Sequence, residues 1–223
     1  MKLYLTASRS KNSFIIFDLK TNACEAIPYQ EALDCKHLKD QGRKTFRPFG
    51  IYEDEEFVYI ASNDRLGKFS RDDYDFKGLV KNVPLFINTH QILKHNGVWF
   101  TANSSNDSIT ISNEKTVSFF DVSAKRLVSK VSTPLNANEL DDHHINSVSI
   151  INENLYVLAH NNGRSDIYVL DIQTLAIKEI IQTPAKCAHG LEHYNGHLYT
   201  LCSGTNSLCE ITLTNKVLHK LPV

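Results

Sequence analysis

The chain has 223 residues, of which 42% are hydrophobic and 22% are charged, and its formal net charge is −1. This composition is typical of one globular domain with a real core. The near-neutral charge offers no broad attraction to nucleic acid or to an acidic membrane surface. No stretch approaches the roughly 18–20 apolar residues of a membrane span. We therefore expect neither nucleic acid nor a membrane as a partner.

The chain has five cysteines, an odd number, without CxxC spacing. Such a set is typical of free thiols in a reducing compartment. Met1 runs almost directly into the first predicted strand, without a positive segment and apolar run of signal type. Together these features predict a cytoplasmic protein.

One short phrase occurs five times along the chain: a hydrophobic strand that ends in a small residue and continues into a polar loop. The copies are about 40 to 57 residues apart, as in repeat proteins with one repeat per blade. They begin at Leu3, Val58, Val98, Leu155 and Leu198. In an all-strand context this repeat predicts an all-β fold, a five-bladed β-propeller.

Each phrase lies inside a larger unit of predicted strands. A strand precedes it across a tight turn, which is Asn96-Gly97 in the third unit and Asn195-Gly196 in the fifth. Asn-Gly between hydrophobic runs is a strong hairpin signal because both residues tolerate positive φ. Third and fourth strands follow the phrase, for example at Thr116–Val122 and Arg126–Ser132 in the third unit. Four strands per unit give approximate blades at 1–30, 46–82, 87–133, 143–183 and 186–223 of one domain, 1–223.

The first unit departs from this pattern because it begins at its second strand. Either the first blade has three strands, or the segment Asp34–Thr45 does something irregular. The segment Glu31–Asp40 could form a short helix, with Leu33, Cys35 and Leu38 roughly on one side. We therefore expect an incomplete first blade.

The loops that enter the innermost strands of a propeller open onto one face near its axis. Alignment of the unit starts predicts that four side chains meet there: Phe49, His90, Asn146 and His189. Arg47, His143 and His144 are expected a step further out. His90, Asn146 and His189 could hold one divalent metal ion, since neutral imidazole is the commonest metal ligand. Alternatively, these polar side chains hydrogen-bond to one another and to water.

The loops after the second strands open onto the same face and carry many hydrogen-bonding groups. They supply further candidate ligand-binding residues, which are Asn103, His160, Asn161 and Arg164. The same residue types are ordinary turn formers. Five such loops on one face favour binding of a polar ligand, a sugar or an anion.

Three blade starts resemble a known class of propellers. They are RPFGI (Arg47–Ile51), HHINSV (His143–Val148) and CAHGLE (Cys187–Glu192), and they resemble the NHL/SMP-30-like class. The segment containing HHINSV also resembles bacterial propeller families of uncharacterised function. The resemblance implies a propeller architecture. SMP-30-like lactonases hold a metal with Glu and Asn or Asp on the axis; Asn146 matches one such ligand, and no axial Glu matches another.

These observations predict a soluble propeller that binds a small polar molecule or a peptide on its axial face. The alternative is a metal-dependent hydrolase or lyase. In that alternative His90 and His189 hold the ion, His144 acts as acid and base, and Arg47 or Arg164 holds an anionic substrate. The motifs GxSxG, GxxxxGK[ST], HExxH and GxGxxG are absent. The sequence therefore leaves open whether the protein is an enzyme, which ligand it takes and its oligomeric state.

Overall fold

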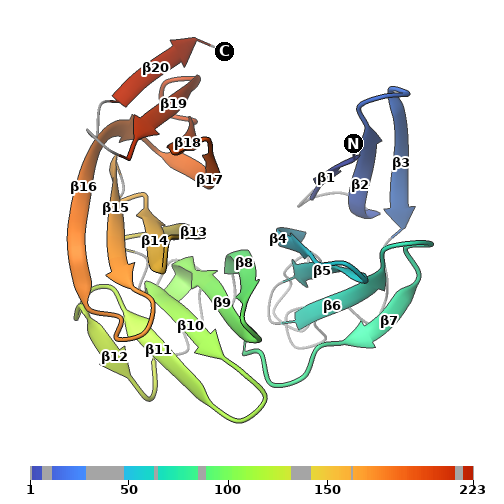
Figure 1. Cartoon of the computed structure of the whole chain (residues 1–223), viewed down its shortest axis with the longest axis horizontal. Coiled ribbons are helices and arrows are strands. Elements are labelled where there is room, and N and C mark those ends of the chain that lie inside the picture. The colour runs from blue at the N-terminus through green and yellow to red at the C-terminus, as the bar shows by residue number, and fades with distance from the viewer. Residues whose placement is uncertain are drawn as a thin grey trace, which may run out of the picture.

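The strands of the chain form five small antiparallel sheets around one axis (Figure 1). The structure is a computed structural model, and it describes residues 2–6, 12–28, 48–62, 65–84, 89–131, 142–161, 163–213 and 218–222. The fold is a five-bladed β-propeller, as the repeat predicts, and the blades follow one another in chain order. The helical content of the described residues is one 3₁₀ turn, η2 (Ser104–Asn106).

Blade 1 contains β1 (Lys2–Leu5), β2 (Asn12–Asp18) and β3 (Ala23–Pro28). Blade 2 contains β4 (Pro48–Glu53), β5 (Phe57–Ser62), β6 (Arg65–Ser70) and β7 (Phe76–Leu79). Blade 3 contains β8 (Thr89–His95), β9 (Val98–Asn103), β10 (Ser108–Ser112), β11 (Val117–Asp121) and β12 (Arg126–Val128). Blade 4 contains β13 (Ile145–Ile151), β14 (Asn154–Ala159), β15 (Arg164–Asp171) and β16 (Ile177–Lys186). Blade 5 contains β17 (Ala188–Tyr194), β18 (His197–Cys202), β19 (Ser207–Thr212) and β20 (Leu218–Pro222).

Blade 3 has five strands where the sequence predicts four. The additional strand is β10, which pairs with β9 on one side and β11 on the other. Its sequence, SITIS, alternates hydroxyl and isoleucine side chains, so it lacks the continuous hydrophobic run used to find the other strands. The predicted third strand, Thr116–Val122, is therefore the fourth strand of this blade.

Blade 1 has three strands, in the order β1-β2-β3. This is one of the two possibilities that the sequence leaves open. The segment Asp34–Thr45 and the helix expected at Glu31–Asp40 lie outside the described residues.

The predicted Asn-Gly hairpins are present in blades 3 and 5. The φ angles are 48° at Asn96 and 77° at Gly97, and 49° at Asn195 and 80° at Gly196. Two consecutive positive φ angles are the signature of a type I′ turn, whose twist matches that of the flanking strands. Each of these turns follows the last residue of an innermost strand, so it lies at the opposite end of that strand from its first residue.

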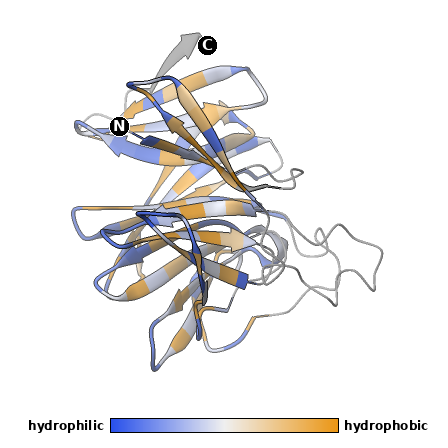
Figure 2. Ribbon diagram, turned by 90° about the vertical axis from the view of Figure 1, so that its right-hand side faces the viewer, coloured by the Kyte–Doolittle hydropathy of each residue, from blue (hydrophilic) through white to orange (hydrophobic). Residues whose placement is uncertain are grey.

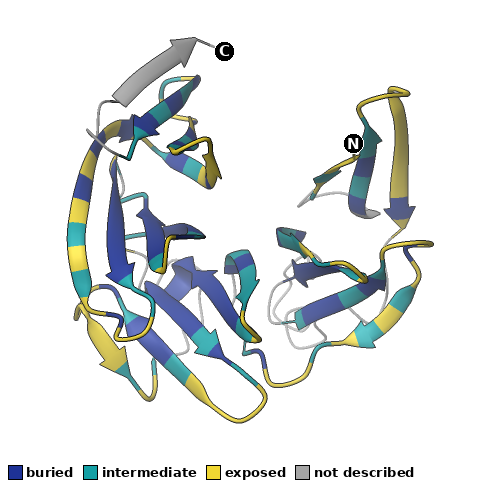
Figure 3. Ribbon diagram, viewed as in Figure 1, coloured by how far each residue is buried: buried dark blue, intermediate teal, exposed yellow. Residues whose placement is uncertain are grey.

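The second strands of blades 2, 3 and 4, which are β5, β9 and β14, pack against both neighbouring blades. In β5, Val58 and Ile60 join a cluster with Phe14 of blade 1, while Tyr59 joins one with Trp99 of blade 3. Successive side chains of a strand point to opposite faces of the sheet, so a strand covered on both faces is hydrophobic throughout. Figure 2 shows hydrophobic residues concentrated in the strands, and Figure 3 shows that the middle of each sheet is the most buried part.

The core consists of four hydrophobic clusters, one between each pair of successive blades. They join blades 1 and 2, 2 and 3, 3 and 4, and 4 and 5. Within the described ranges no such cluster joins blade 5 to blade 1, and the ribbons of these two blades stand apart in Figure 1. The innermost strands nevertheless lie side by side in the order β4, β8, β13 and β17. Their first residues therefore come together at one face. Among the described residues no helix is long and apolar enough to cross a membrane.

Candidate functional site: an axial histidine cluster

The four innermost strands share an irregularity close to their first residues. In β8, Thr89 pairs with Asn103 but Gln91 pairs with Ala102, so His90 has no residue opposite it. Equivalent register shifts occur in β4, β13 and β17, and in β13 the residue left over is Asn146. A β-bulge changes the direction in which a side chain points and is common next to functional sites. The bulges at His90 and Asn146 therefore take these two predicted axial side chains out of the regular alternation of their sheets.

Four imidazole rings lie in a row across blades 3, 4 and 5. The ring centroids of His90 and His144 are 5.0 Å apart, those of His144 and His160 are 5.0 Å apart, and those of His160 and His189 are 5.5 Å apart. All four side chains are partly exposed. We call these four residues the axial histidine cluster. They come from three blades, and the packing of β13 against β8 on one side and β17 on the other brings them together.

Each end of the row contacts one more predicted axial residue. Phe49 of β4 stacks on His90, with ring centroids 4.9 Å apart and planes inclined by 27°. At the other end, the Asn146 Nδ2 group donates a hydrogen bond of 2.7 Å to Nδ1 of His189. A ring that accepts at Nδ1 is neutral and carries its proton on Nε2. The structure thus joins Phe49 to His90 and Asn146 to His189, and the rings of His144 and His160 lie between these two pairs.

Burial keeps two of the imidazoles uncharged. It lowers the pKa of His90 to about 3, and the charges that His144, His189 and His160 would carry lower it further. Burial, followed by the charge of His144, also lowers the pKa of His189. At neutral pH both rings are therefore neutral, and each provides one donor and one acceptor. Neutral rings suit hydrogen bonding to a polar group or ligation of a transition-metal ion.

The described residues contain no group of three or more His, Cys, Asp or Glu side chains arranged to hold a metal ion. The predicted metal set, His90, Asn146 and His189, has its two imidazoles at opposite ends of the row. A shared ion would therefore require the rings to turn about their side-chain bonds.

Asp107, which follows η2 in blade 3, holds the loop that carries His144. Its Oδ2 accepts backbone N–H bonds of 2.8 Å from Asp142 and His143, and its Oδ1 accepts one of 2.9 Å from His144. His144 has a positive φ of 49°, a conformation that a β-carbon disfavours. Three bonds to one carboxylate fix that conformation and hence the position of the His144 ring. Asp107 has no distinguishing signal in the sequence, since an Asn-Asp pair after a strand is typical of an ordinary turn.

Two predicted ligand-binding residues belong to a second group beside the cluster. His143 Nδ1 donates a hydrogen bond of 2.9 Å to Asn161 Oδ1, and Asn161 Nδ2 donates one of 3.1 Å to Asp166 Oδ2. Asp166 in turn forms an ion pair of 3.2 Å with Nε of Arg164, an exposed side chain. The carboxylate of Asp166 therefore already neutralises the guanidinium predicted to hold an anion.

Asn103 lies near the same end of blade 3, but its side chain is inaccessible. It is 0% exposed. Its Oδ1 accepts hydrogen bonds from the hydroxyls of Thr89 (2.8 Å) and Thr101 (3.3 Å), and its Nδ2 donates to those of Thr110 (2.8 Å) and Ser108 (3.4 Å). All the hydrogen-bonding capacity of the amide is used inside the blade. Arg47, the remaining candidate, lies outside the described residues.

The alignment of unit starts predicts that His144 lies a step further from the axis. It predicts that His160 lies in a separate set of loops. In the structure both contribute rings to the middle of the row. The backbone explains this: the N–H of His160 donates to the carbonyl of His144 at 3.3 Å, so the end of β14 and the start of β13 hold the two side by side. The antiparallel pairing of the first and second strands of blade 4 is the signal that could have indicated that His144 and His160 are neighbours.

Comparisons with known proteins support the fold alone. No protein-family model and no curated protein sequence matches the chain. Solved structures do match it. A protein of unknown function from Bacteroides caccae has a TM-score of 0.64 at 9% identity, over 100% of this chain and 73% of that one. The β-propeller domain of Cps50 (Swd1) from Myceliophteria thermophila has a TM-score of 0.54 at 11% identity, over 98% of this chain and 67% of that one.

The computationally designed Ika8 protein gives a TM-score of 0.54 at 7% identity, and this chain spans 57% of its length. Identities this low define a class of protein, the β-propellers, and no particular family within it. The likeness to the NHL/SMP-30-like class therefore stays a prediction from three blade starts.

Proposed function

We propose that this β-propeller binds a small polar molecule or a peptide at its axial face, in the axial histidine cluster. One observation carries the proposal: four partly exposed imidazoles lie in contact on the axis, and two of them are held neutral. Apolar side chains would fill this place at less cost than imidazoles, whose polar nitrogens need partners. The cluster is thus better explained by binding than by folding.

The electrostatics of the cluster favour a neutral polar ligand. Uncharged imidazoles attract an anion weakly, whereas each offers a directed donor and a directed acceptor to hydroxyl or amide groups. The exposed Arg164 is already paired with Asp166. A ligand rich in hydroxyl or amide groups fits this face.

A second function, metal-dependent hydrolysis or elimination, rests on the spacing of the rings. Imidazoles that share one ion, with metal–nitrogen bonds of about 2.0–2.1 Å, have ring centres about 5 Å apart. The spacings in the cluster are 5.0, 5.0 and 5.5 Å. These spacings join neighbouring rings of the row. His90 and His189 lie at its opposite ends, so they would hold the ion together with Asn146 only after their side chains turn toward each other, and His144 would act as acid and base.

The test compares thermal melts of tag-free protein in the presence of sugars, sugar acids, short peptides and divalent metal salts. A ligand present at about 100 times its Kd stabilises by roughly 2.7 kcal/mol, which raises the Tm of a domain this size by about 5–10 °C. We expect this rise in the wild type and its loss in His90→Gln/His189→Gln. Metal analysis of the purified protein separates the two functions.

The matched control is His95→Gln/His193→Gln, which removes two imidazoles outside the cluster. It should keep the ligand-induced rise. If the cluster variant melts more than about 10 °C below the wild type without any ligand, the histidines are structural and the proposal is wrong.

A further inference from the structure

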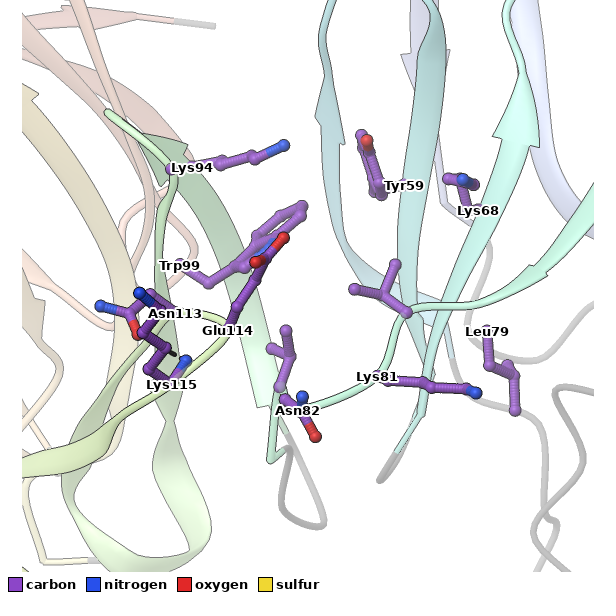
Figure 4. Close-up of a pocket in the computed structure, with 13 residues that line it drawn as sticks. Tyr59, Lys68, Leu79, Lys81, Asn82, Lys94, Trp99, Asn113, Glu114 and Lys115 are labelled. Carbon is purple, nitrogen blue, oxygen red and sulfur yellow. Dashed lines mark hydrogen bonds between the residues drawn. The ribbon is translucent and has the colours of Figure 1, made fainter.

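A second site lies between blades 2 and 3, away from the axial histidine cluster. It is a cavity of about 950 Å³, which Figure 4 shows between the two sheets. Its lining includes Gly97, in the hairpin turn between β8 and β9. At about 3.3 Å per residue, Gly97 lies about 20 Å along the strand from His90. Whatever occupies this cavity is therefore independent of the ligand proposed for the axis.

Lysines dominate the charge of this cavity. They come from both walls: Lys68 and Lys81 from blade 2 and the segment after it, and Lys94 and Lys115 from blade 3 (Figure 4). Glu114 is the only acidic side chain among the described residues that line the cavity. The chain as a whole has a net charge of −1, so this local excess of positive charge is not a general property of the surface.

The ammonium groups of two of the lysines contact an aromatic ring or a carboxylate, and among the described residues those of the other two do not. Lys94 lies 5.4 Å from the ring centroid of Trp99 and 3.9 Å from a carboxylate oxygen of Asp54. Lys68 lies 4.2 Å above the ring of Phe57. In the part of the chain that the structure describes, Lys81 and Lys115 form no ion pair and no cation–π contact, and both are exposed. These two charges contribute nothing evident to the fold.

The inner wall of the cavity is apolar. Tyr59 and Trp99 meet edge to face, with centroids 4.9 Å apart, and Val80 and Val83 lie in the segment that leads from blade 2 to blade 3. Trp99 is 6% exposed and Tyr59 is 5% exposed. Because both rings are almost fully buried and the Lys94 ammonium lies over each of them, they offer little free surface on which a nucleic-acid base could stack.

We propose that this cavity binds an acidic peptide segment that carries an aliphatic side chain between its carboxylates. Lysines on both walls match negative charges spread along a chain, whereas a single phosphate is normally held by donors that converge on one point. The apolar inner wall takes the aliphatic side chain, which loses its contact with water there.

Trp99 provides a direct readout, because it is the only tryptophan of the chain and lies in the cavity. The probe is a short synthetic peptide in which Asp and Glu alternate with Leu and which lacks aromatic residues. Titration at low salt should change the emission of Trp99 and release or absorb heat in a calorimeter. A peptide with Asn and Gln in place of Asp and Glu should bind at least about tenfold more weakly.

The variant Lys81→Gln/Lys115→Gln should weaken binding of the acidic peptide about tenfold, and added salt should weaken it further. Its control is Lys20→Gln/Lys130→Gln, which removes the same charge from exposed positions outside the cavity and should bind within about twofold of the wild type. Equal affinity of the two double variants would overturn the proposal. So would tighter binding of a single-stranded oligonucleotide in the same titration, or the absence of both heat and emission change with the acidic peptide.

Discussion

Two groups of polar side chains lie near the same end of the blades, and they differ in how far they are buried. Asn103 in blade 3 is buried, and its amide makes four hydrogen bonds to neighbouring hydroxyls. The rings of the axial histidine cluster are partly exposed, and each lies 5.0 to 5.5 Å from the next. A buried polar group must be paired, and full pairing leaves no capacity for a ligand. The comparison separates a buried polar group that supports the blade from a partly exposed one that solvent reaches.

The largest expected effect is at Asn103. Asn103→Leu keeps the volume of the side chain but leaves the hydroxyls of Thr89, Thr101 and Thr110 without their partner in a dry interior. Leaving a buried polar group unpaired costs about 1–3 kcal/mol, so we expect the free energy of unfolding to fall by about 3 kcal/mol. Urea unfolding measures the change. A fall below 1 kcal/mol would show that the network is not structural.

Asp107 connects the two groups, because it belongs to the buried end of blade 3 and holds the loop of His144. Asp107→Asn replaces one acceptor oxygen with an N–H₂ group that faces backbone N–H groups. Charge-assisted hydrogen bonds of this kind contribute more than neutral ones, so the variant should lose about 2 kcal/mol of stability.

The same variant should also weaken ligand binding at the axis, because His144 is no longer held in its left-handed conformation. The matched control is Asp121→Asn, which alters a turn carboxylate that accepts a backbone N–H from Ala124 within its own turn. A loss of stability without any change in binding would separate Asp107 from the site.

The repeat makes the architecture predictable, because each hydrophobic phrase and each Asn-Gly turn constrains its own blade. Blade 3 is harder to predict because β10 alternates serine and threonine with isoleucine. The hydroxyls of Ser108 and Thr110 are buried with a hydrogen bond to Asn103 on the neighbouring strand β9. A strand whose polar side chains are paired by a residue of another strand carries little local signal.

The site is predictable only in part, for a related reason. The bulged residues His90 and Asn146 occupy equivalent positions in their blades, so an alignment of unit starts finds them. The contact of His144 with His160 depends on how β13 pairs with β14. The pairing of Asp107 with the following blade depends on tertiary structure alone. Asn103 and Asn161 have the same residue type, and only burial distinguishes them.

A smaller effect is expected from acidification. The folded-state pKa of His90 is lowered to about 3 from its ordinary value of 6.5, so between these values the unfolded chain binds more protons than the folded one. Stability is therefore complete above pH 6.5 and is lost as the pH falls toward 3. At pH 5.5 protonation of His90 in the unfolded chain lowers the free energy of unfolding by about 1 kcal/mol.

Chemical unfolding of the wild type and of His90→Gln at pH 7.5 and pH 5.5 measures this contribution. The wild type should lose more stability than the variant over this interval, by about 1 kcal/mol. Equal losses would mean that His90 is protonated in the folded protein, and the neutral character assigned to the cluster would then be wrong.

The smallest effect on stability is expected at Arg164, which tests whether charge plays a part in the axial site. Its ion pair with Asp166 is largely exposed on the arginine side, and exposed pairs contribute about 0–1 kcal/mol. Arg164→Gln should therefore change the free energy of unfolding by less than about 0.5 kcal/mol.

If neutral imidazoles bind a polar, uncharged ligand, the Arg164→Gln variant should also keep its affinity for that ligand within about twofold. A tenfold loss for sugar acids, with sugars unaffected, would instead assign Arg164 to an anionic substrate. The comparison of sugars with sugar acids thus decides which of the two groups beside the axis, the histidine row or the arginine with its carboxylate, contacts the ligand.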